Sequence, residues 1–321
     1  MNYYLGVDVG SLTVKFVLLD EKENVLFSLY ERTAGNPISA IQKALKKLND
    51  FFEEKKIEKK IAGLGTTGSA RYLASAILGA DLIKNEITAH AQGVLPFLPD
   101  VKTIIEIGGQ DSKIIILEEG RVVDFAMNLL CSAGTGAFLD AQSYRLGIDV
   151  RNFGEIALKS KNPTAIASRC SVFAESDMIH KQQVGHLIED IVAGLCLGLA
   201  RNFLSTLGKG KNIQEPIAFL GGVSENLGMR WAFEKLLGKK IIVPSYNTVT
   251  GALGVALLTK RKNLSKTKFR GFDISDMKVE CSSFVCKGCS NECEVISAQI
   301  EGKIVGRWGD RCGKWSNLTQ A

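Results

Sequence analysis

One strand pattern occurs twice in this chain, and the repetition limits the folds that the chain can adopt. The first copy, "YYLGVDVGSLTVKFVLLD" followed by "NVLFSLYER", alternates apolar and polar residues around a glycine turn. The second copy, "VKTIIEIGGQDSKIIILEEGRVVDFAMN", repeats the alternation from residue 101. Alternation of this kind, interrupted by glycine turns, predicts three antiparallel strands in each copy.

Segments with helical spacing follow each copy. After the first come a helix in "PISAIQKALKKLNDFFEEKK" and a short buried strand in "KIAGLGTTG". After the second come four helices, in "GAFLDAQSYRLG", "NFGEIALKS", "VFAESDMIHKQQ" and residues 185–207. The chain then gives strand, turn and helix in "PIAFLGGVSENLGMRWAFEKLLG", a strand in "KIIVP" and a closing helix in "GALGVALLTKR". The duplication predicts an α/β fold with two lobes, residues 1–98 and 99–261, and a cleft between them.

Composition excludes several classes of protein. The net charge of +6 is spread along the 321 residues without a long Lys/Arg block, so no nucleic-acid partner is expected. No apolar run is long enough to cross a membrane. The start, "MNYYLGVDVGS", lacks the regions of a signal peptide. We therefore expect a cytoplasmic protein.

Both copies carry polar side chains at the glycine turn. A glycine turn between strands lets backbone N–H groups approach phosphate oxygens, and a nearby aspartate can hold Mg²⁺ through water. Either turn alone could be an ordinary hairpin, but the pair predicts a triphosphate clamp. The residues concerned are Asp8, Gly10, Ser11, Leu12, Thr13 and Lys15 in the first turn, and Glu106, Gly108, Gly109, Gln110, Asp111 and Lys113 in the second.

A third glycine turn, "FLGGVSENLG", lies between a strand and a helix. Gly221 and Gly222 would allow close approach of a flat adenosine, and Asn226 follows them. The chain has neither a Walker A motif nor a G-x-G-x-x-G motif, so a P-loop or Rossmann fold is not expected.

Two cysteines lie where helices are expected to begin. Cys131 opens "CSAGTGAF", which includes Gly134 and Gly136, and Cys170 opens "CSVFAESD". A helix N-terminus stabilises a thiolate through its free N–H groups. A [4Fe–4S] cluster needs four thiolates, which two chains related by a two-fold axis would supply. Burial as small apolar residues is the alternative, and it suits Cys196 in "IVAGLCLGLA" better.

These motifs resemble known families. The three turns, in this order, resemble the superfamily of actin, sugar kinases and heat-shock chaperones, which implies a duplicated ribonuclease H-like, actin-like ATPase fold. "GVDVGS", "NEITAHAQG", "IIEIGGQDSK", "CSAGTGAF", "SRCSVFAESD" and "GGVSENLG" resemble the activators of 2-hydroxyacyl-CoA dehydratases and the related ATPase subunits of benzoyl-CoA reductase. The resemblance covers residues 1–260.

The resemblance implies a function and roles for residues. It implies a homodimer with one bridging [4Fe–4S] cluster that takes an electron from ferredoxin or flavodoxin. ATP hydrolysis to ADP would drive this electron into a partner iron–sulfur dehydratase or reductase. Cys131 and Cys170 would be the cluster ligands. Phosphate and Mg²⁺ would be bound by Asp8, Gly10, Ser11, Lys15, Gln110 and Asp111, with the nucleoside at Gly221 and Gly222.

The last segment, residues 262–321, departs from that pattern, because ordinary members of the family end near "LLTKRK". It holds five of the eight cysteines, few strands and no clear helix. A segment of this size is expected to need a metal to fold. We expect Cys286, Cys289, Cys293 and Cys312 to bind Zn²⁺ or a second [4Fe–4S] cluster, with Cys281 as an alternative ligand.

Two other functions stay open at this point. A small-molecule kinase of the same fold would turn over ATP only with a sugar or acid and would hold no cluster. A metal sensor or maturation protein would use ATP as a switch. The partner enzyme and its acyl-CoA do not follow from the residues.

Overall fold

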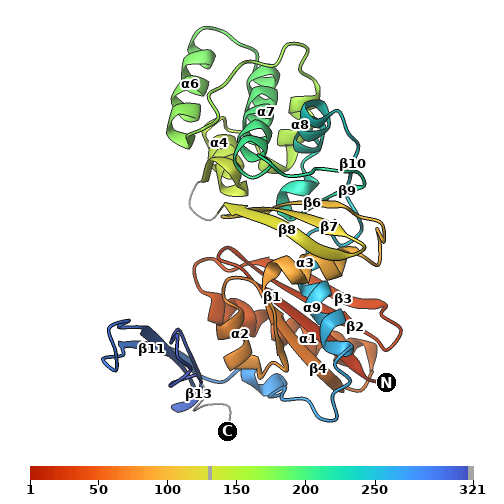
Figure 1. The fold of residues 1–321 in the computed structure, drawn as a ribbon, viewed down its shortest axis with the longest axis vertical. Coiled ribbons are helices and arrows are strands. Elements are labelled where there is room, and N and C mark those ends of the chain that lie inside the picture. Colours follow the sequence, from red (N-terminus) through yellow and green to blue (C-terminus); the bar gives the residue numbers. More distant parts are fainter. Residues whose placement is uncertain (129–131, 317–321) are drawn as a thin grey trace. The chain divides into compact units, whose positions relative to one another are not determined.

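Two five-stranded sheets of the same topology form the framework of the protein (Figure 1). The structure is a computed structural model that describes residues 1–128 and 132–316. Its contacts divide the chain into a first unit, residues 1–93 with 251–321, and a second unit, residues 94–250. Each unit contains one of the two sheets.

The first unit has the strand order β3-β2-β1-β4-β5. Its strands are β1 (Tyr3–Val9), β2 (Thr13–Leu19), β3 (Val25–Arg32), β4 (Ile61–Thr67) and β5 (Leu82–Ile83). Strand β1 runs antiparallel to β2 and parallel to β4. The accompanying helices are α1 (Pro37–Lys55), α2 (Arg71–Leu78), α3 (Glu86–Val94) and α9 (Thr250–Lys260).

The second unit repeats this order as β8-β7-β6-β9-β10. Its strands are β6 (Thr103–Ile107), β7 (Ser112–Glu118), β8 (Arg121–Asn128), β9 (Ile217–Leu220) and β10 (Ile241–Ile242). Five helices lie on one side of the sheet in Figure 1: α4 (Gly136–Arg145), α5 (Phe153–Leu158), α6 (Ser171–Gln183), α7 (Ile188–Thr206) and α8 (Leu227–Leu237). The predicted strands and helices of both copies are therefore confirmed. The short elements α2 and β5 were not anticipated.

The duplication extends to single residues. In the first hairpin Asp8 is the cross-strand partner of Lys15, and in the second Glu106 is the partner of Lys113. Residues opposite each other in an antiparallel pair lie on the same face of the sheet. Each unit therefore places one carboxylate and one lysine side by side beside its glycine turn.

Period-two alternation on β1 places Asp8 and the core residues on opposite faces. Leu5 and Val7 are buried in the core cluster that includes α1 and α2. Gly6 lies on the other face, where a Cβ would stand 1.9 Å from the Ala252 carbonyl oxygen of α9. Asp8 shares this face. The absent side chain at Gly6 thus lets α9 pack directly on the sheet.

The contacts of α9 assign it to the first unit, although it lies beyond residue 250 in the sequence. The sequence boundaries had placed this helix in a lobe spanning residues 99–261. The reason for the difference is packing. Helix α9 lies so close to the sheet that only glycine fits at Gly65 of β4, as at Gly6, since a Cβ at Gly65 would lie 2.3 Å from Thr259 Oγ1. Sequence order does not reveal such a return of the chain.

The C-terminal segment forms an antiparallel sheet of three strands, where the sequence analysis expected few strands. These are β11 (Val279–Val285), β12 (Glu294–Ile300) and β13 (Lys303–Trp308), in that order. The sheet is not an isolated appendage. Ile274 and Ile300 are buried in the core cluster of the first unit. The Arg270 backbone N–H also donates to the Leu78 carbonyl oxygen at the end of α2.

This docking changes the stability argument for residues 262–321. The sequence analysis treated the segment as too small to fold without a metal. Phe272 packs edge-to-face on Phe52 of α1, with ring centroids 5.7 Å apart, and Phe269 packs on Phe272 at 5.3 Å. Apolar burial against the first unit therefore supplies stability that a free segment would lack.

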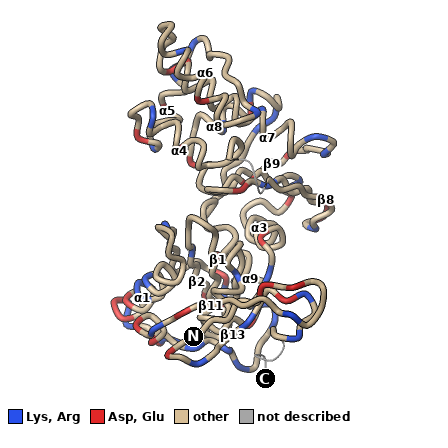
Figure 2. Tube along the Cα trace, turned by 90° about the vertical axis from the view of Figure 1, so that its left-hand side faces the viewer, with Lys and Arg blue, Asp and Glu red and all other residues tan. Residues whose placement is uncertain are grey.

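Two surface properties agree with the composition. Figure 2 shows Lys and Arg interspersed with Asp and Glu along the traces of both units. Within residues 1–128 and 132–316, no helix is long and apolar enough to cross a membrane.

We predict that Phe272→Ala destabilises the protein by about 2 kcal/mol, because it removes a partly buried ring from the junction between α1 and the C-terminal segment. Chemical denaturation of the full chain measures this change. Ile304→Ala on the exposed part of β13 is the matched control and should cost much less. Equal effects of the two changes would mean that the segment does not share the core of the first unit.

Candidate functional site

The first glycine turn is held by backbone bonds and carries one ion pair. The Gly10 N–H donates to the Thr13 carbonyl oxygen over 2.9 Å, which closes the turn between β1 and β2. Lys15 Nζ lies 3.0 Å from Asp8 Oδ2. Ser11 at the tip is exposed, and Leu12 beside it accepts the Thr33 N–H through its carbonyl oxygen. The turn is therefore rigid at its base and open at its tip.

Backbone surrounds the Asp8 carboxylate in the first unit. A Cβ at Gly68 would lie 2.4 Å from Asp8 Oδ1, and one at Gly251 would lie 2.8 Å from Asp8 Oδ2. Gly251 lies in the first turn of α9, whose N-terminus favours negative charge. Next to Asp8 in the ladder, Thr67 Oγ1 is buried with no hydrogen-bond partner among the described residues. An additional polar group at this place would satisfy it.

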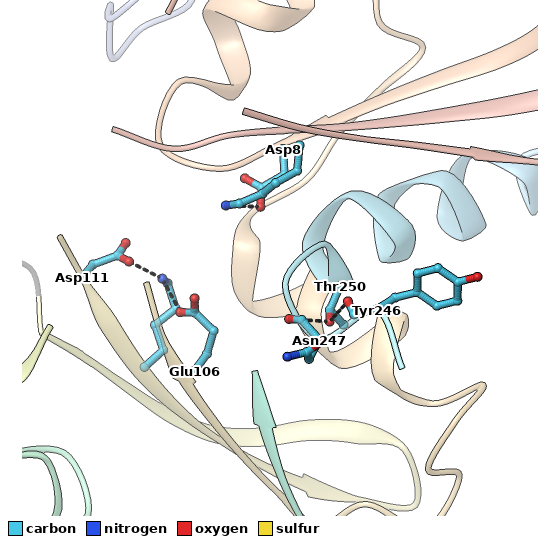
Figure 3. Close-up of polar contacts among 8 residues, drawn as sticks. Asp8, Glu106, Asp111, Tyr246, Asn247 and Thr250 are labelled. Carbon is cyan, nitrogen blue, oxygen red and sulfur yellow. Dashed lines mark hydrogen bonds and ion pairs between the residues drawn. The ribbon is translucent and has the colours of Figure 1, made fainter. Parts of the chain in front are cut away.

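The second glycine turn has the same base and a stronger charge cluster. The Gly108 N–H donates to the Asp111 carbonyl oxygen over 3.0 Å. Lys113 Nζ lies 2.9 Å from both Glu106 Oε2 and Asp111 Oδ1, as Figure 3 shows for the two carboxylates. Gln110 at the tip is exposed. The buried Lys113 thus holds Asp111 in the turn, and Glu106 also balances the lysine charge. Gln110 is the neighbour of Asp111 in this turn.

Lys113 is buried, and its charge is maintained by its partners. Burial alone would lower the pKa of the Lys113 ammonium, but the charges of Glu106 and Asp111 and their hydrogen bonds raise this pKa above its ordinary value of 10.5. A raised folded-state pKa gives stability that is complete below the unfolded pKa and is lost only as the pH rises through the folded one. The ion pair is therefore fully formed throughout the neutral range.

The second turn is bonded directly to the start of α4. The Gly136 N–H donates to the Gly108 carbonyl oxygen over 2.9 Å, and the Ala137 N–H donates to the Gly109 carbonyl oxygen over 2.8 Å. Gly134, in the short 3-10 turn Ser132–Gly134 that precedes α4, is buried. A Cβ at Gly134 would lie 3.7 Å from Ser112 Oγ, so both glycines that the sequence analysis chose in this loop lie close to the second glycine turn.

The third glycine turn follows β9 and precedes α8. Gly221 has φ +84, and a Cβ there would lie 2.3 Å from the Ile107 carbonyl oxygen, so only glycine fits. Gly222 is exposed. Asn226 caps α8 by accepting the Met229 N–H, while its Nδ2 is buried without a partner among the described residues. The turn therefore has one open edge and one polar group available for a ligand.

Asn247 is a site residue that sequence reasoning missed. Its buried side chain donates to Ser224 Oγ over 2.7 Å and to the Glu225 carboxylate, and its carbonyl oxygen accepts the Gly221 N–H. Thr250 Oγ1 donates back to the Asn247 carbonyl oxygen (Figure 3). No spacing in "PSYNTVTG" indicates this role, because the partners come from a turn more than twenty residues earlier. Asn247 holds the third turn in shape.

Cys170 lies where the sequence analysis expected it, and Cys131 lies outside the described residues. Cys170 is the N-cap residue of α6 and is half-buried. Ser132 follows Cys131 in the sequence, and Ser171 follows Cys170. Both serines are described, and Ser132 Oγ lies 3.3 Å from Ser171 Oγ. Ser132 and the N-terminus of α6 are therefore adjacent.

The other cysteines divide into a core residue and a surface group. Cys196 is fully buried in α7, where burial raises the pKa of its thiol to about 12, so the expectation of a core role is confirmed. Cys289 and Cys312 are exposed, and Cys286 and Cys293 are half-buried. Across residues 1–128 and 132–316, no three His, Cys, Asp or Glu side chains are arranged to hold a metal ion.

The arrangement suits a nucleotide in three respects. The exposed tips at Ser11 and Gln110 leave backbone N–H groups accessible to phosphate oxygens. Asp8 and Asp111 are carboxylates of the kind that bind Mg²⁺ directly or through water. Gly221 has no side chain, so a ligand can approach the backbone there closely. Chemically, the groups of each unit can bind phosphate oxygens or a hydrated metal ion.

Two sheets of matching order, each with a charged glycine turn, define an ATPase of the actin-like fold class. The chain belongs to the BadF/BadG/BcrA/BcrD ATPase family, whose pattern matches residues 5–259.

Several relatives resemble the chain over most of their length. The 2-hydroxyisocaproyl-CoA dehydratase activator of Clostridioides difficile is 37% identical over 256 residues, which cover 79% of this chain and 94% of the relative. The (R)-2-hydroxyglutaryl-CoA dehydratase activating ATPase of Acidaminococcus fermentans is 36% identical and covers 81% and 98%. A solved structure of the 2-hydroxyisocaproyl-CoA dehydratase activator from Clostridium difficile, with bound ADPNP, aligns with a TM-score of 0.72 at 34% identity, over 81% and 95% of the two chains.

We predict that Lys113→Met lowers the free energy of unfolding by about 3–5 kcal/mol at pH 7, because a buried carboxylate loses its cation. Denaturant titration measures this loss. Lys211→Met breaks the exposed pair with Asp124 and should cost less than about 1 kcal/mol. Equal losses for the two variants would contradict the buried-charge explanation.

Proposed function

We propose that this chain is an ATP-driven electron-transfer activator, which hydrolyses ATP and passes a low-potential electron to a partner iron–sulfur enzyme. The names of its relatives, activators of 2-hydroxyacyl-CoA dehydratases, support this function. A 2-hydroxyacyl-CoA dehydratase or a related reductase is the partner, and ferredoxin or flavodoxin is the electron donor.

The nucleotide is Mg-ATP, and the three glycine turns bind it. The bound ADPNP of the related structure supports a nucleotide at this fold. The backbone at Gly10, Ser11, Gly108 and Gly109, with Leu12 and Thr13 beside them, binds phosphate oxygens. Asp8, Gln110 and Asp111 hold Mg²⁺ and the attacking water, Lys15 neutralises charge, and the third turn with Gly221, Gly222 and Asn226 receives the nucleoside.

The observation that carries the proposal is the contact between Ser132 and Ser171. Their hydroxyl oxygens lie 3.3 Å apart, and each serine directly follows a cysteine in the chain. Ser132 precedes α4 and Ser171 begins α6, so the segments at the starts of these two helices are adjacent. Two thiolates at such positions can ligate one metal cluster. When bound, a [4Fe–4S] cluster would supply the one-electron chemistry.

Two copies of the chain are needed to complete the ligand set. A cubane cluster takes four thiolates, and each chain offers two at this place. Around Cys170, the large side chains of Val172 and Phe173 are 66% and 68% exposed, and Tyr144 of α4 is 87% exposed. Exposed apolar groups of this size favour a protein contact. We assign this surface to the second copy of a homodimer.

The hydrogen bonds at α4 give a path from nucleotide to cluster. The carbonyl oxygens of Gly108 and Gly109 accept N–H groups from the first turn of α4. Cys131 directly precedes Ser132 in the sequence, and we expect a shift of the second glycine turn on hydrolysis to be transmitted through α4 to the cluster. Changes in hydrogen bonding and solvent around a cluster alter its reduction potential. ATP hydrolysis would thereby be coupled to electron transfer.

We expect Cys170→Ala to abolish the iron bound by the anaerobically purified dimer, because one cluster would lose two of its four ligands. Iron and acid-labile sulfide analysis measures this loss, and ADP titration should give an affinity close to that of the parent protein. Cys196→Ala, in the core of the same unit, is the matched control and should keep its iron. Full iron in Cys170→Ala, or ATP turnover that requires a sugar or acid, would refute the activator.

Phe173→Glu should shift the protein from dimer to monomer, since it places a charge in the assigned contact surface. Sedimentation velocity of the iron-loaded protein measures the change. Phe125→Glu, at a phenylalanine of strand β8 that is 51% exposed, is the control and should stay dimeric. A dimer that persists in Phe173→Glu with unchanged affinity would place the contact elsewhere.

A further inference from the structure

The loop between β11 and β12 carries three cysteines in a closed hairpin. The Cys286 N–H donates to the Cys293 carbonyl oxygen over 2.9 Å, which extends the strand ladder by one pair beyond Val285 and Glu294. At the tip, the Glu292 N–H donates to the Cys289 carbonyl oxygen. The backbone therefore brings Cys286 and Cys293 opposite each other, with Cys289 on the turn between them.

A fourth cysteine lies on a second loop that contacts the first. Asp310 Oδ2 accepts the Trp315 N–H over 2.8 Å and closes the loop that contains Cys312. The Trp315 ring packs edge-to-face on Phe284 with centroids 5.0 Å apart. Tryptophan thus fixes the loop of Cys312 against the end of β11, next to the three-cysteine hairpin.

Two N–H groups point at the sulfur of Cys286. Trp315 Nε1 donates to Cys286 Sγ over 3.3 Å, and the Gly288 backbone N–H donates to the same sulfur. Donors that converge on a cysteine sulfur stabilise it as a thiolate and orient it, as groups around metal-bound sulfur do. The side chains of Lys287, Arg311 and Lys314 bring positive charge to the same loops.

Strand geometry separates Cys281 from this group. Side chains alternate between the faces of a strand, so Phe284 and Cys286 lie on one face and Cys281 on the other. Cys281 is also paired in the ladder with Ala298, well inside the sheet. The alternative ligand of the sequence analysis is therefore disfavoured by its position.

The four thiols are not required for the fold of the segment. The sheet docks on α1 and α2 through buried apolar residues, and the cysteines are free. Four free thiols on two adjacent, solvent-accessible loops would oxidise readily unless they had a ligand. This points to a binding role for the cysteines.

We propose that Cys286, Cys289, Cys293 and Cys312 bind one Zn²⁺ ion on the surface of the first unit. Zinc prefers tetrahedral thiolate sets with short ligand spacings, and these loops supply spacings of two and three residues within the hairpin. The sulfurs do not converge among the described residues. Cys289 and Cys312 are exposed, so their side chains are free to turn toward Cys286, whose sulfur already accepts two N–H groups. An iron–sulfur cluster suits the loops less well, because these two cysteines are exposed to water among the described residues.

The zinc site is independent of the proposed electron-transfer function. It lies in the part of the chain beyond residue 259, where the family pattern ends. Its test therefore uses the full chain with Cys131→Ala and Cys170→Ala, so that only the C-terminal thiols can report. Failure of the zinc site leaves the cluster proposal unaffected, and the reverse holds as well.

Co²⁺ titration of this reduced, metal-stripped double variant measures the site. We expect one equivalent of Co²⁺ to give the thiolate charge-transfer and visible bands of a tetrahedral site, and Zn²⁺ to displace it. Adding Cys286→Ser should weaken Co²⁺ binding by more than about 100-fold, because a direct ligand is lost. Adding Cys281→Ser instead is the matched control and should leave binding unchanged.

A second readout follows Trp315, whose indole contacts Cys286. Zn²⁺ should change the fluorescence of the double variant, and this change should disappear when Trp315→Phe is added while Co²⁺ still binds. Absence of tetrahedral Co²⁺ bands, or equal loss with Cys281→Ser, would overturn the proposal. Anaerobic reconstitution with iron and sulfide that yields a cluster at these cysteines in preference to Zn²⁺ would overturn the choice of metal.

Discussion

A carboxylate paired with a lysine across the first hairpin of each unit is the interaction on which the site depends. In the second unit the pair is buried, so the lysine charge cannot be removed without exposing a carboxylate to a low-dielectric interior. The lysine binds Glu106 within the strand and Asp111 in the turn. It therefore fixes the turn to the sheet, and the position of the turn sets the position of everything bonded to it.

The most important element bonded to that turn is α4. Its first two N–H groups donate to the carbonyl oxygens of Gly108 and Gly109. The same end of α4 follows the loop of Ser132, which contacts Ser171 at the start of α6. The second glycine turn, α4 and the start of α6 are thus connected through hydrogen bonds and the contact between Ser132 and Ser171.

The C-terminal segment shows how docking can free residues from a structural role. Apolar side chains of the segment complete the core of the first unit, and backbone groups at Arg270 and Leu78 pair across the junction. The fold of the three-stranded sheet is therefore secured without metal. Its cysteines are free and lie at or near the surface.

Local pattern was sufficient for the strands, the glycine turns and the duplication, because alternation and glycine placement act over a few residues. It also located Cys170 at a helix start and Cys196 in the core. It did not find Asn247, since the partners of this side chain lie in a distant turn. It also did not find that α9 returns to pack on the first sheet at Gly6. Contacts between segments far apart in the chain depend on close packing in three dimensions, which no short-range pattern encodes.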